Sequence, residues 1–232
     1  MKLLRTIAVP LLCLLGACQS PPEPAPPASS TPAAAPIAEA TGTTFTIDTQ
    51  QSWLRILVYK SGRLARFGHN HVISSHAIDG QVVLDGPVPV IALSLPLAEL
   101  RVDDSAQRAA EGEDFPGEIP DKDRAGTRGN MLGEALLNAQ RFPVLSIQSF
   151  DVRGDGPEYN VDANVTLAGR SSSVTFPVTV TRDGDTLTAT GRTQILHEAL
   201  GLTPFTALLG ALSVRDDIGL HYYFVASRDD ET

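Results

Sequence analysis

A strict alternation of apolar and polar residues constrains the fold of this chain most, and it is clearest in the stretch EYNVDANVTL at 158–167. Successive side chains of an extended strand point to opposite faces, so this strand has one apolar and one polar face. Similar stretches predict strands at 44–48, 52–60, 76–85, 90–97, 143–151, 174–180, 187–195 and 218–226. Many short strands with hairpin turns predict an all-β fold, either a sandwich or a barrel. An up-and-down antiparallel barrel of about eight strands would leave no sheet edge unpaired.

Three stretches depart from this alternation. Residues 128–140 place apolar side chains at helical spacing and predict a short helix. The apolar stretch 198–212 contains a second candidate helix start. The charged stretch 103–128 is expected to be a solvated loop with a helical turn at 103–110. The barrel should therefore carry one or two short helices.

The first residues indicate export from the cytoplasm. A basic start and a short apolar run end in Leu-Gly-Ala-Cys, which predicts a signal peptide over residues 1–17. The small residues before Cys18 resemble the bacterial lipobox, and this resemblance implies a diacylglycerol anchor on the Cys18 sulfur. By resemblance to lipoprotein sorting rules, Gln19 favours an outer-membrane lipoprotein that faces the periplasm. The alternative is an ordinary secretory signal with a chance cysteine.

The anchor and the strands are separated by a stretch rich in Pro, Ala and Ser. Residues 18–42 are expected to be the lipidated cysteine and a disordered, extended linker, because they contain almost no large apolar side chain. The remaining residues, 43–232, are expected to form one domain. No cysteine lies in that domain, so its hydrophobic core must hold it together. The chain has 18 basic and 27 acidic residues, the wrong balance for a nucleic-acid-binding protein.

Several segments of the domain, in collinear order over residues 43–227, resemble the YceI-like family. They are FTIDTQQSWLRILV, GRLARFG, AIDGQVVLD, LRVDD, RGNMLGEALLNAQRFPVLSIQS, YNVDANVTLAGRSSSVTFPVTV and GLTPFTALLGALSVRDDIGLHYYFVA. The resemblance implies a lipocalin-like antiparallel barrel in the periplasm that binds a polyisoprenoid or another long lipid. The chain departs from the family pattern at Lys60, where typical members have a histidine, and in a longer stretch after Gly68.

The resemblance, and not the periodicity, implies that the barrel is hollow and binds its ligand inside. The candidate lining residues are Val161, Val165, Phe176, Val178, Phe205, Leu208 and Phe224, with Trp53 and Phe67 near an entrance. A polar head group would meet Lys60, Arg66, His69 or His71 at the barrel mouth. The expected function is non-catalytic binding or carriage of an isoprenoid or fatty-acid-like lipid, without any other cofactor.

Three histidines lie close together in the stretch ARFGHNHVISSHAIDG, which covers residues 65–80. On a strand, His69 and His71 would face the same side, as two metal ligands do, whereas His76 would face the other side unless a turn redirects it. One alternative function is therefore a metal- or stress-related binding protein that uses these three residues. The other interpretation is that they hydrogen-bond a strand end, a neighbouring carboxylate or a ligand head group.

Other functional classes have less support in the sequence. The chain has no Gly-x-Ser-x-Gly elbow, Gly-rich phosphate loop or zincin motif, so we do not expect an enzyme. A structural envelope protein with a filled barrel is a third hypothesis, because a small barrel can be packed solid by its own side chains. The expected partners are the membrane, through the lipid anchor, and a hydrophobic small molecule. A homodimer is left open.

Overall fold

The computed structural model describes residues 40–229. The expected signal peptide, Cys18 and most of the expected linker lie outside the described residues. The strands are β1 (Thr43–Ile47), β2 (Trp53–Ser61), β3 (His71–Ser75), β4 (Asp79–Leu84), β5 (Val90–Pro96), β6 (Arg101–Val102), β7 (Val144–Arg153), β8 (Glu158–Leu167), β9 (Arg170–Asp183), β10 (Thr186–Leu196), β11 (Thr206–Ala207) and β12 (Leu212–Arg228). The helices are α1 (Ser105–Ala110) and α2 (Asp121–Leu132), with 3-10 turns η1 (Ala65–Phe67), η2 (Leu97–Glu99), η3 (Glu198–Leu200) and η4 (Leu208–Gly210).

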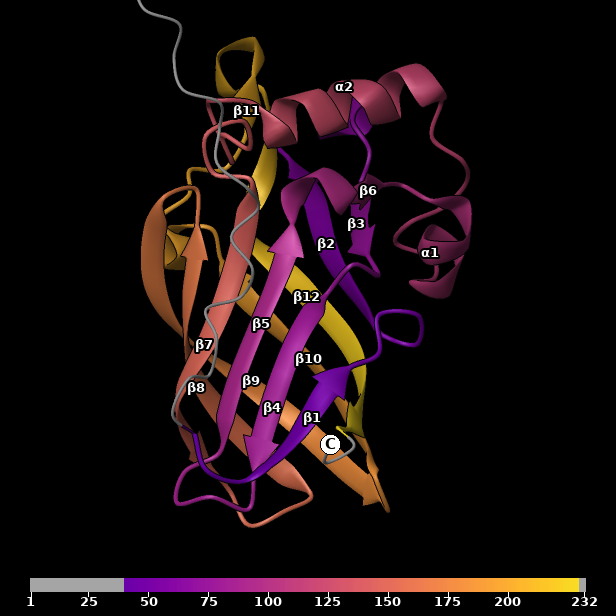
Figure 1. Cartoon of the computed structure of the whole chain (residues 1–232). Coiled ribbons are helices and arrows are strands. Elements are labelled where there is room, and N and C mark those ends of the chain that lie inside the picture. Colours follow the sequence, from indigo (N-terminus) through magenta and orange to yellow (C-terminus); the bar gives the residue numbers. More distant parts are fainter. Residues whose placement is uncertain (1–39, 230–232) are drawn as a thin grey trace, which may run out of the picture. The chain divides into compact units, whose positions relative to one another are not determined.

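Eight of the strands close into an antiparallel barrel (Figure 1). They follow one another around the ring in the order β1, β4, β5, β7, β8, β9, β10 and β12, and β12 pairs with β1. The closing register joins Phe45 to Arg228 and Ile47 to Ala226. Strands β2, β3 and β6 extend the sheet from the earlier part of β12. The expected all-β antiparallel barrel of about eight strands with one or two short helices is confirmed.

The alternation seen in the sequence separates the inside of the barrel from its outside. In β8, Val161, Val165 and Leu167 are buried, whereas Asn164 and Thr166 between them are exposed. All strand pairings and hydrophobic clusters of the described residues involve positions between 43 and 228. The barrel therefore has a core of its own and is a self-contained folding unit. Among the described helices, none is long and apolar enough to span a membrane.

The two ends of the barrel carry different elements (Figure 1). Helix α2 and the β11–β12 hairpin lie at one end, which we call the α2 end, and the β4–β5 and β9–β10 hairpins lie at the other. Helix α2 has no buried residue. It is held to the barrel by Arg128, which donates hydrogen bonds to the backbone oxygens of Ala98 (2.7 Å) and Leu100 (3.4 Å). Met131 and Leu132, at the end of the helix, also pack against the hydrophobic core, so polar and apolar contacts together keep this helix in place.

Both helices begin where the local sequence provides a start signal. Helix α1 confirms the helical turn expected at 103–110. It begins there because the Asp104 carboxylate accepts hydrogen bonds from the N–H groups of Ala106 and Gln107. Helix α2 begins inside the stretch that we expected to be a loop. Pro120 precedes it, and Asp121 and Asp123 place negative charge at its positive N-terminal end.

The structure also corrects two expected helices and reveals three strands that were not predicted. The helix expected at 128–140 ends at Leu132, because the chain then folds into turns that include Asn138 in a left-handed conformation with φ of 45°. The candidate helix start in 198–212 develops into short 3-10 turns and β11, since Gly201 has φ of 67° and ends η3. The longest of the unpredicted strands is β3, which carries His71 and pairs with β2; β6 and β11 have two residues each.

Candidate ligand-binding cavity

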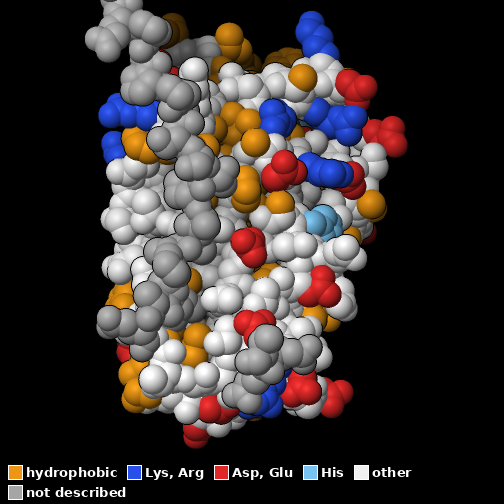
Figure 2. All heavy atoms as spheres, in the orientation of Figure 1, with side chains coloured by type: hydrophobic (Ala, Val, Ile, Leu, Met, Phe, Trp, Pro, Cys, Tyr) orange, Lys and Arg blue, Asp and Glu red, His pale blue; other side chains and the backbone are white. Residues whose placement is uncertain are grey.

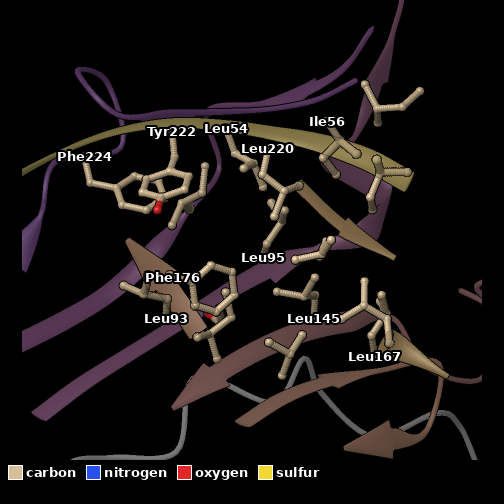
Figure 3. A pocket seen from close by; sticks show the side chains of 18 of the residues that line it. Leu54, Ile56, Leu93, Leu95, Leu145, Leu167, Phe176, Leu220, Tyr222 and Phe224 are labelled. Carbon is tan, nitrogen blue, oxygen red and sulfur yellow. The ribbon is translucent and has the colours of Figure 1, made fainter. Parts of the chain in front are cut away.

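The inside of the barrel is a cavity of about 450 Å³. Figure 3 shows aliphatic and aromatic side chains from several strands pointing into it, including Leu54, Leu95, Phe176 and Leu220. Close-packed protein interiors contain few voids larger than a water molecule, whereas small-molecule sites measure roughly 300–1,000 Å³. The barrel is therefore hollow, and its cavity is large enough for a small-molecule ligand.

The wall of the cavity follows the inward parity of each strand. Leu54, Ile56 and Val58 line it from β2, and Leu93 and Leu95 line it from β5. These side chains offer no hydrogen-bonding group to a ligand. The wall can therefore stabilise a bound molecule only by removing apolar surface from water and by van der Waals contact.

Polar side chains reach the cavity at few points. His71 from β3 and Thr127 and Asn130 from α2 form a polar group at the α2 end. Tyr222 also lines the cavity, but its hydroxyl donates a hydrogen bond to the backbone oxygen of Pro177. Burial raises the pKa of Tyr222 to about 12, so its phenol is neutral and already partnered. Ser94 from β5, Tyr159 from β8 and His197 also line the cavity, so its polar groups are few but are not confined to the α2 end.

His71 is held in place by a buried carboxylate. Its Nδ1 lies 2.6 Å from Oδ2 of Asp103, whose other oxygen accepts hydrogen bonds from the Val72 N–H (2.9 Å) and from Arg108 (2.6 Å). Burial acts to raise the pKa of Asp103, but the hydrogen bonds from His71, the Val72 N–H and Arg108, together with the charge of His71, outweigh it, so the pKa lies below its ordinary value. An ionised Asp103 only accepts hydrogen bonds, so Nδ1 of His71 carries a proton. The Nε2 atom remains for another partner.

Arg108 completes this buried charge cluster. Its guanidinium is almost fully buried and donates to Asp103 and to the backbone oxygens of Asn70 (2.7 Å), Pro116 (3.1 Å) and Gly117 (3.2 Å). It therefore ties the stretch after α1 to the beginning of β3. We call Asp103, His71 and Arg108 the buried triad.

The cavity opens at the α2 end. Of the residues that line it, only Asn130 and Phe205 are exposed, and all the others are buried or partly buried. Asn130 belongs to α2, and Phe205 directly precedes β11. A ligand that passes between these elements would reach the polar group formed by His71, Thr127 and Asn130 as it enters.

Most residues expected to line the barrel do so. The following predicted residues face the cavity: Val161, Val165, Phe176, Val178, Phe205 and Phe224. Trp53 does not, because it has the outward parity of β2 and stacks on Tyr223 with ring centroids 6.1 Å apart. Phe67 and Leu208 are each 66% exposed and also lie outside the cavity.

Of the four residues expected to meet a head group, the structure places only His71 on the cavity. Lys60 donates a hydrogen bond from Nζ to the backbone oxygen of Gly68 (3.0 Å). The Arg66 guanidinium lies over the ring of its neighbour Phe67. His69 is exposed, and its Nε2 lies 4.0 Å from Oδ2 of Asp123. These three side chains lie around the α2 end but do not line the cavity.

The structure does not bring the three clustered histidines together as metal ligands. His71 faces Asp103, whereas Nδ1 of His76 is 2.8 Å from the backbone oxygen of Ser52. Within residues 40–229, no group of three or more His, Cys, Asp or Glu side chains has the geometry to hold a metal ion.

Sequence reasoning missed the role of Asp103, Arg108, Thr127 and Asn130, which lie in or next to the stretch 103–128. The one local signal was the Asp-Asp pair at 103–104, in which the second aspartate caps α1 and the first has φ of 54°. Nothing in the spacing joins Asp103 to His71, because they are 32 residues apart. That contact exists only because β3 and β6 pair.

Comparisons with known proteins agree with this architecture. The family model of the YceI-like domain matches residues 45–226. The crystal structure of Burkholderia cenocepacia BcnA is similar with a TM-score of 0.57 and 18% sequence identity, covering 78% of this chain and 99% of that chain. The Campylobacter jejuni YCEI protein has a TM-score of 0.45 and 11% identity, covering 66% of this chain and 82% of that chain. No curated protein matches the chain.

Proposed function

This chain belongs to the YceI-like family, and on that premise we propose that its barrel binds and carries one amphiphilic lipid with a long apolar tail, of isoprenoid or fatty-acid type, without performing chemistry on it. The observation that carries the proposal is the hollow, mostly apolar cavity of about 450 Å³, with His71, Thr127 and Asn130 grouped at the end where it opens. An amphiphile has the same division into a long apolar part and one polar end.

The apolar wall of the cavity (its lumen) would bind the lipid tail. Each methylene group transferred from water to an apolar environment contributes roughly 0.8 kcal/mol. A tail of about ten carbons therefore gains roughly 8 kcal/mol before the entropic costs of binding are subtracted. The wall distinguishes ligands by length and shape, since its aliphatic side chains make no directional contact.

The polar group at the α2 end would set the orientation of the bound lipid. Nε2 of His71 is available to the cavity because Nδ1 is engaged by Asp103. Neutral imidazole nitrogen accepts a hydrogen bond from a hydroxyl, and the protonated ring donates to a carboxylate or phosphate. The head group would lie beside His71, Thr127 and Asn130, with the tail extending towards the opposite end of the barrel.

We also propose that Cys18 is lipidated and that the protein is an outer-membrane lipoprotein facing the periplasm, as the lipobox-like sequence predicts. A long, Pro-rich linker would let the barrel move near the membrane surface. Labelling of cells with a radioactive fatty acid should mark the full chain and should not mark its Cys18→Ala variant. Equal labelling of both would exclude the anchor.

The test of ligand binding is native mass spectrometry of residues 40–232, the self-contained barrel, with solvent extraction of the same sample. We expect a stoichiometric lipid adduct, or one formed on incubation with isoprenoid alcohols and long-chain fatty acids. A bare mass under both conditions would reject the carrier function.

A matched pair of variants assigns the adduct to the lumen. Ala189 lines the cavity, so Ala189→Phe should reduce bound lipid without lowering the melting temperature, because the new ring enters empty space. Thr181 is an exposed residue of β9, and Thr181→Phe should leave lipid binding unchanged. Equal binding by both variants would place the lipid outside the barrel.

A further inference from the structure

Two adjacent turns at the α2 end expose large apolar side chains. Phe67 in η1 is 66% exposed, and Leu208 and Leu209 in η4 are 66% and 107% exposed. The turns are neighbours, because the Leu64 N–H donates to the backbone oxygen of Ala211 (2.8 Å). We call Phe67, Leu208 and Leu209 the apolar tip.

The backbone of the tip is unusual for leucine. Leu208 and Leu209 have φ values of 51° and 56°, in the left-handed region that glycine and asparagine adopt most readily. A leucine there costs stability, and the exposed side chains of Leu208 and Leu209 recover little of that cost through packing within residues 40–229. Contact of these side chains with an apolar surface outside the described barrel would offset the cost.

Basic side chains flank the tip. Arg63 and Arg66 lie on the same turn as Phe67 and are exposed. Arg124 and Arg215, by contrast, are paired with Asp121 and Asp217. In residues 40–229, neither Arg63 nor Arg66 has an acidic partner within ion-pair distance. The tip therefore combines apolar side chains with unneutralised positive charge, although the whole chain has a net charge of −9.

The tip is also continuous with the cavity. Phe205, an exposed lining residue, is two residues before Ala207, and the chain then runs directly into Leu208. In Figure 2, hydrophobic, basic and acidic side chains all lie at the end that carries α2. A surface that held the tip would thus lie beside the opening of the cavity.

From the exposed leucines, the free arginines and the nearby opening we infer that the apolar tip docks the barrel onto an anionic lipid bilayer, with its leucines in the acyl–headgroup boundary and Arg63 and Arg66 among the phosphates. Amphipathic surfaces bind at this boundary through buried apolar area and attraction to anionic lipids. The inference extends the proposed lipid carriage, since docking would align the opening with the source of the lipid. The docking itself requires no ligand in the lumen.

The test is flotation of residues 40–232 with vesicles of phosphatidylethanolamine and phosphatidylglycerol, compared with vesicles of phosphatidylcholine alone. We expect flotation with the anionic vesicles and little with the neutral ones. The double variant Leu208→Asn, Leu209→Asn should weaken flotation about tenfold or more. It should also unfold at the same or a higher temperature, because asparagine tolerates the left-handed conformation.

Two further variants make the result specific. Arg63→Ala should weaken binding to anionic vesicles by about fivefold. Val88→Asn changes an exposed apolar residue in the β4–β5 hairpin at the opposite end and should leave flotation unchanged. Unchanged flotation of the double leucine variant, or an equal loss with Val88→Asn, would overturn the inference.

The variants also separate this inference from other occupants and from the proposed function. Light scattering of the unaltered barrel should show a monomer; a dimer that the double leucine variant abolishes would assign the tip to a second copy and overturn membrane docking. Ala189→Phe should float normally while losing bound lipid. If the unaltered barrel floats but holds no lipid in its cavity, lipid carriage alone is rejected. If it holds lipid but does not float, docking alone is rejected.

Discussion

The lumen wall places aliphatic side chains around an empty space, whereas the α2 end buries an ion pair between Asp103 and Arg108 among backbone oxygens. The wall is regular and repeats along every strand. The α2 end is irregular, and its contacts join segments far apart in the sequence. The comparison indicates that the cavity wall depends on apolar packing, whereas the α2 end, where the cavity opens, depends on ion pairs and hydrogen bonds. A substitution in one region should therefore leave the other largely intact.

The largest effect is expected from Arg108→Ala. It would leave the carboxylate of Asp103 buried without its cation, which typically costs about 3–5 kcal/mol of unfolding free energy. Urea denaturation measures the loss. Arg153→Ala is the control, because Arg153 makes its ion pairs at an exposed position and should cost less than about 1 kcal/mol. Similar losses for both variants would mean that the buried triad does not hold the α2 end.

A smaller loss is expected from Leu95→Ala in the wall. Leu95 is buried and contacts the existing cavity, so truncation should cost about 2–3 kcal/mol, at the low end for buried leucines. The cavity should become larger and accept a bulkier tail, which a lipid competition assay by native mass spectrometry would reveal. A loss greater than that of Arg108→Ala would reverse the order proposed for the two regions.

The pH dependence provides a third comparison. The pKa of Asp103 is lower in the folded protein than its ordinary value of 3.8, so the unfolded chain takes up this proton first as the pH falls. The stabilisation is complete above about pH 4 to 5 and is lost as the pH falls through the folded pKa. Asp103→Asn should remove this part of the acid sensitivity in urea titrations. An unchanged acid slope would assign the sensitivity to other carboxylates.

The smallest effects are expected in α2. Gly126 and Gly129 lie inside this exposed helix, and a Cβ at either position would meet no atom within 4 Å. Alanine should therefore stabilise the helix by about 0.5–1 kcal/mol at each site. If α2 moves to admit ligand, lipid release from the double variant should be slower, as followed by transfer to acceptor vesicles. Faster release would exclude a gating role for the helix.

The sequence predicted the wall better than the α2 end, for a physical reason. Side-chain parity is a local property, so Val161, Val165 and Phe176 could be placed inside the barrel from alternation alone. The partner of His71 could not be found in this way, because Asp103 reaches it only through the pairing of β3 with β6. The size of a side chain did not predict its position at Trp53. This large aromatic residue was expected near the entrance of the cavity but faces outward.

The pairing of β1 with β12, which closes the barrel, has a consequence for folding of the protein. Strand β1 is the first of the barrel and β12 is the last, and the ring is complete only when Phe45 pairs with Arg228. Until this pairing forms, the barrel has two open edges, and its closure must wait for contacts of high sequence separation, which form slowly. During that interval the future lumen is an open apolar trough, and a lipid can be enclosed by the final strand rather than threaded through the finished opening.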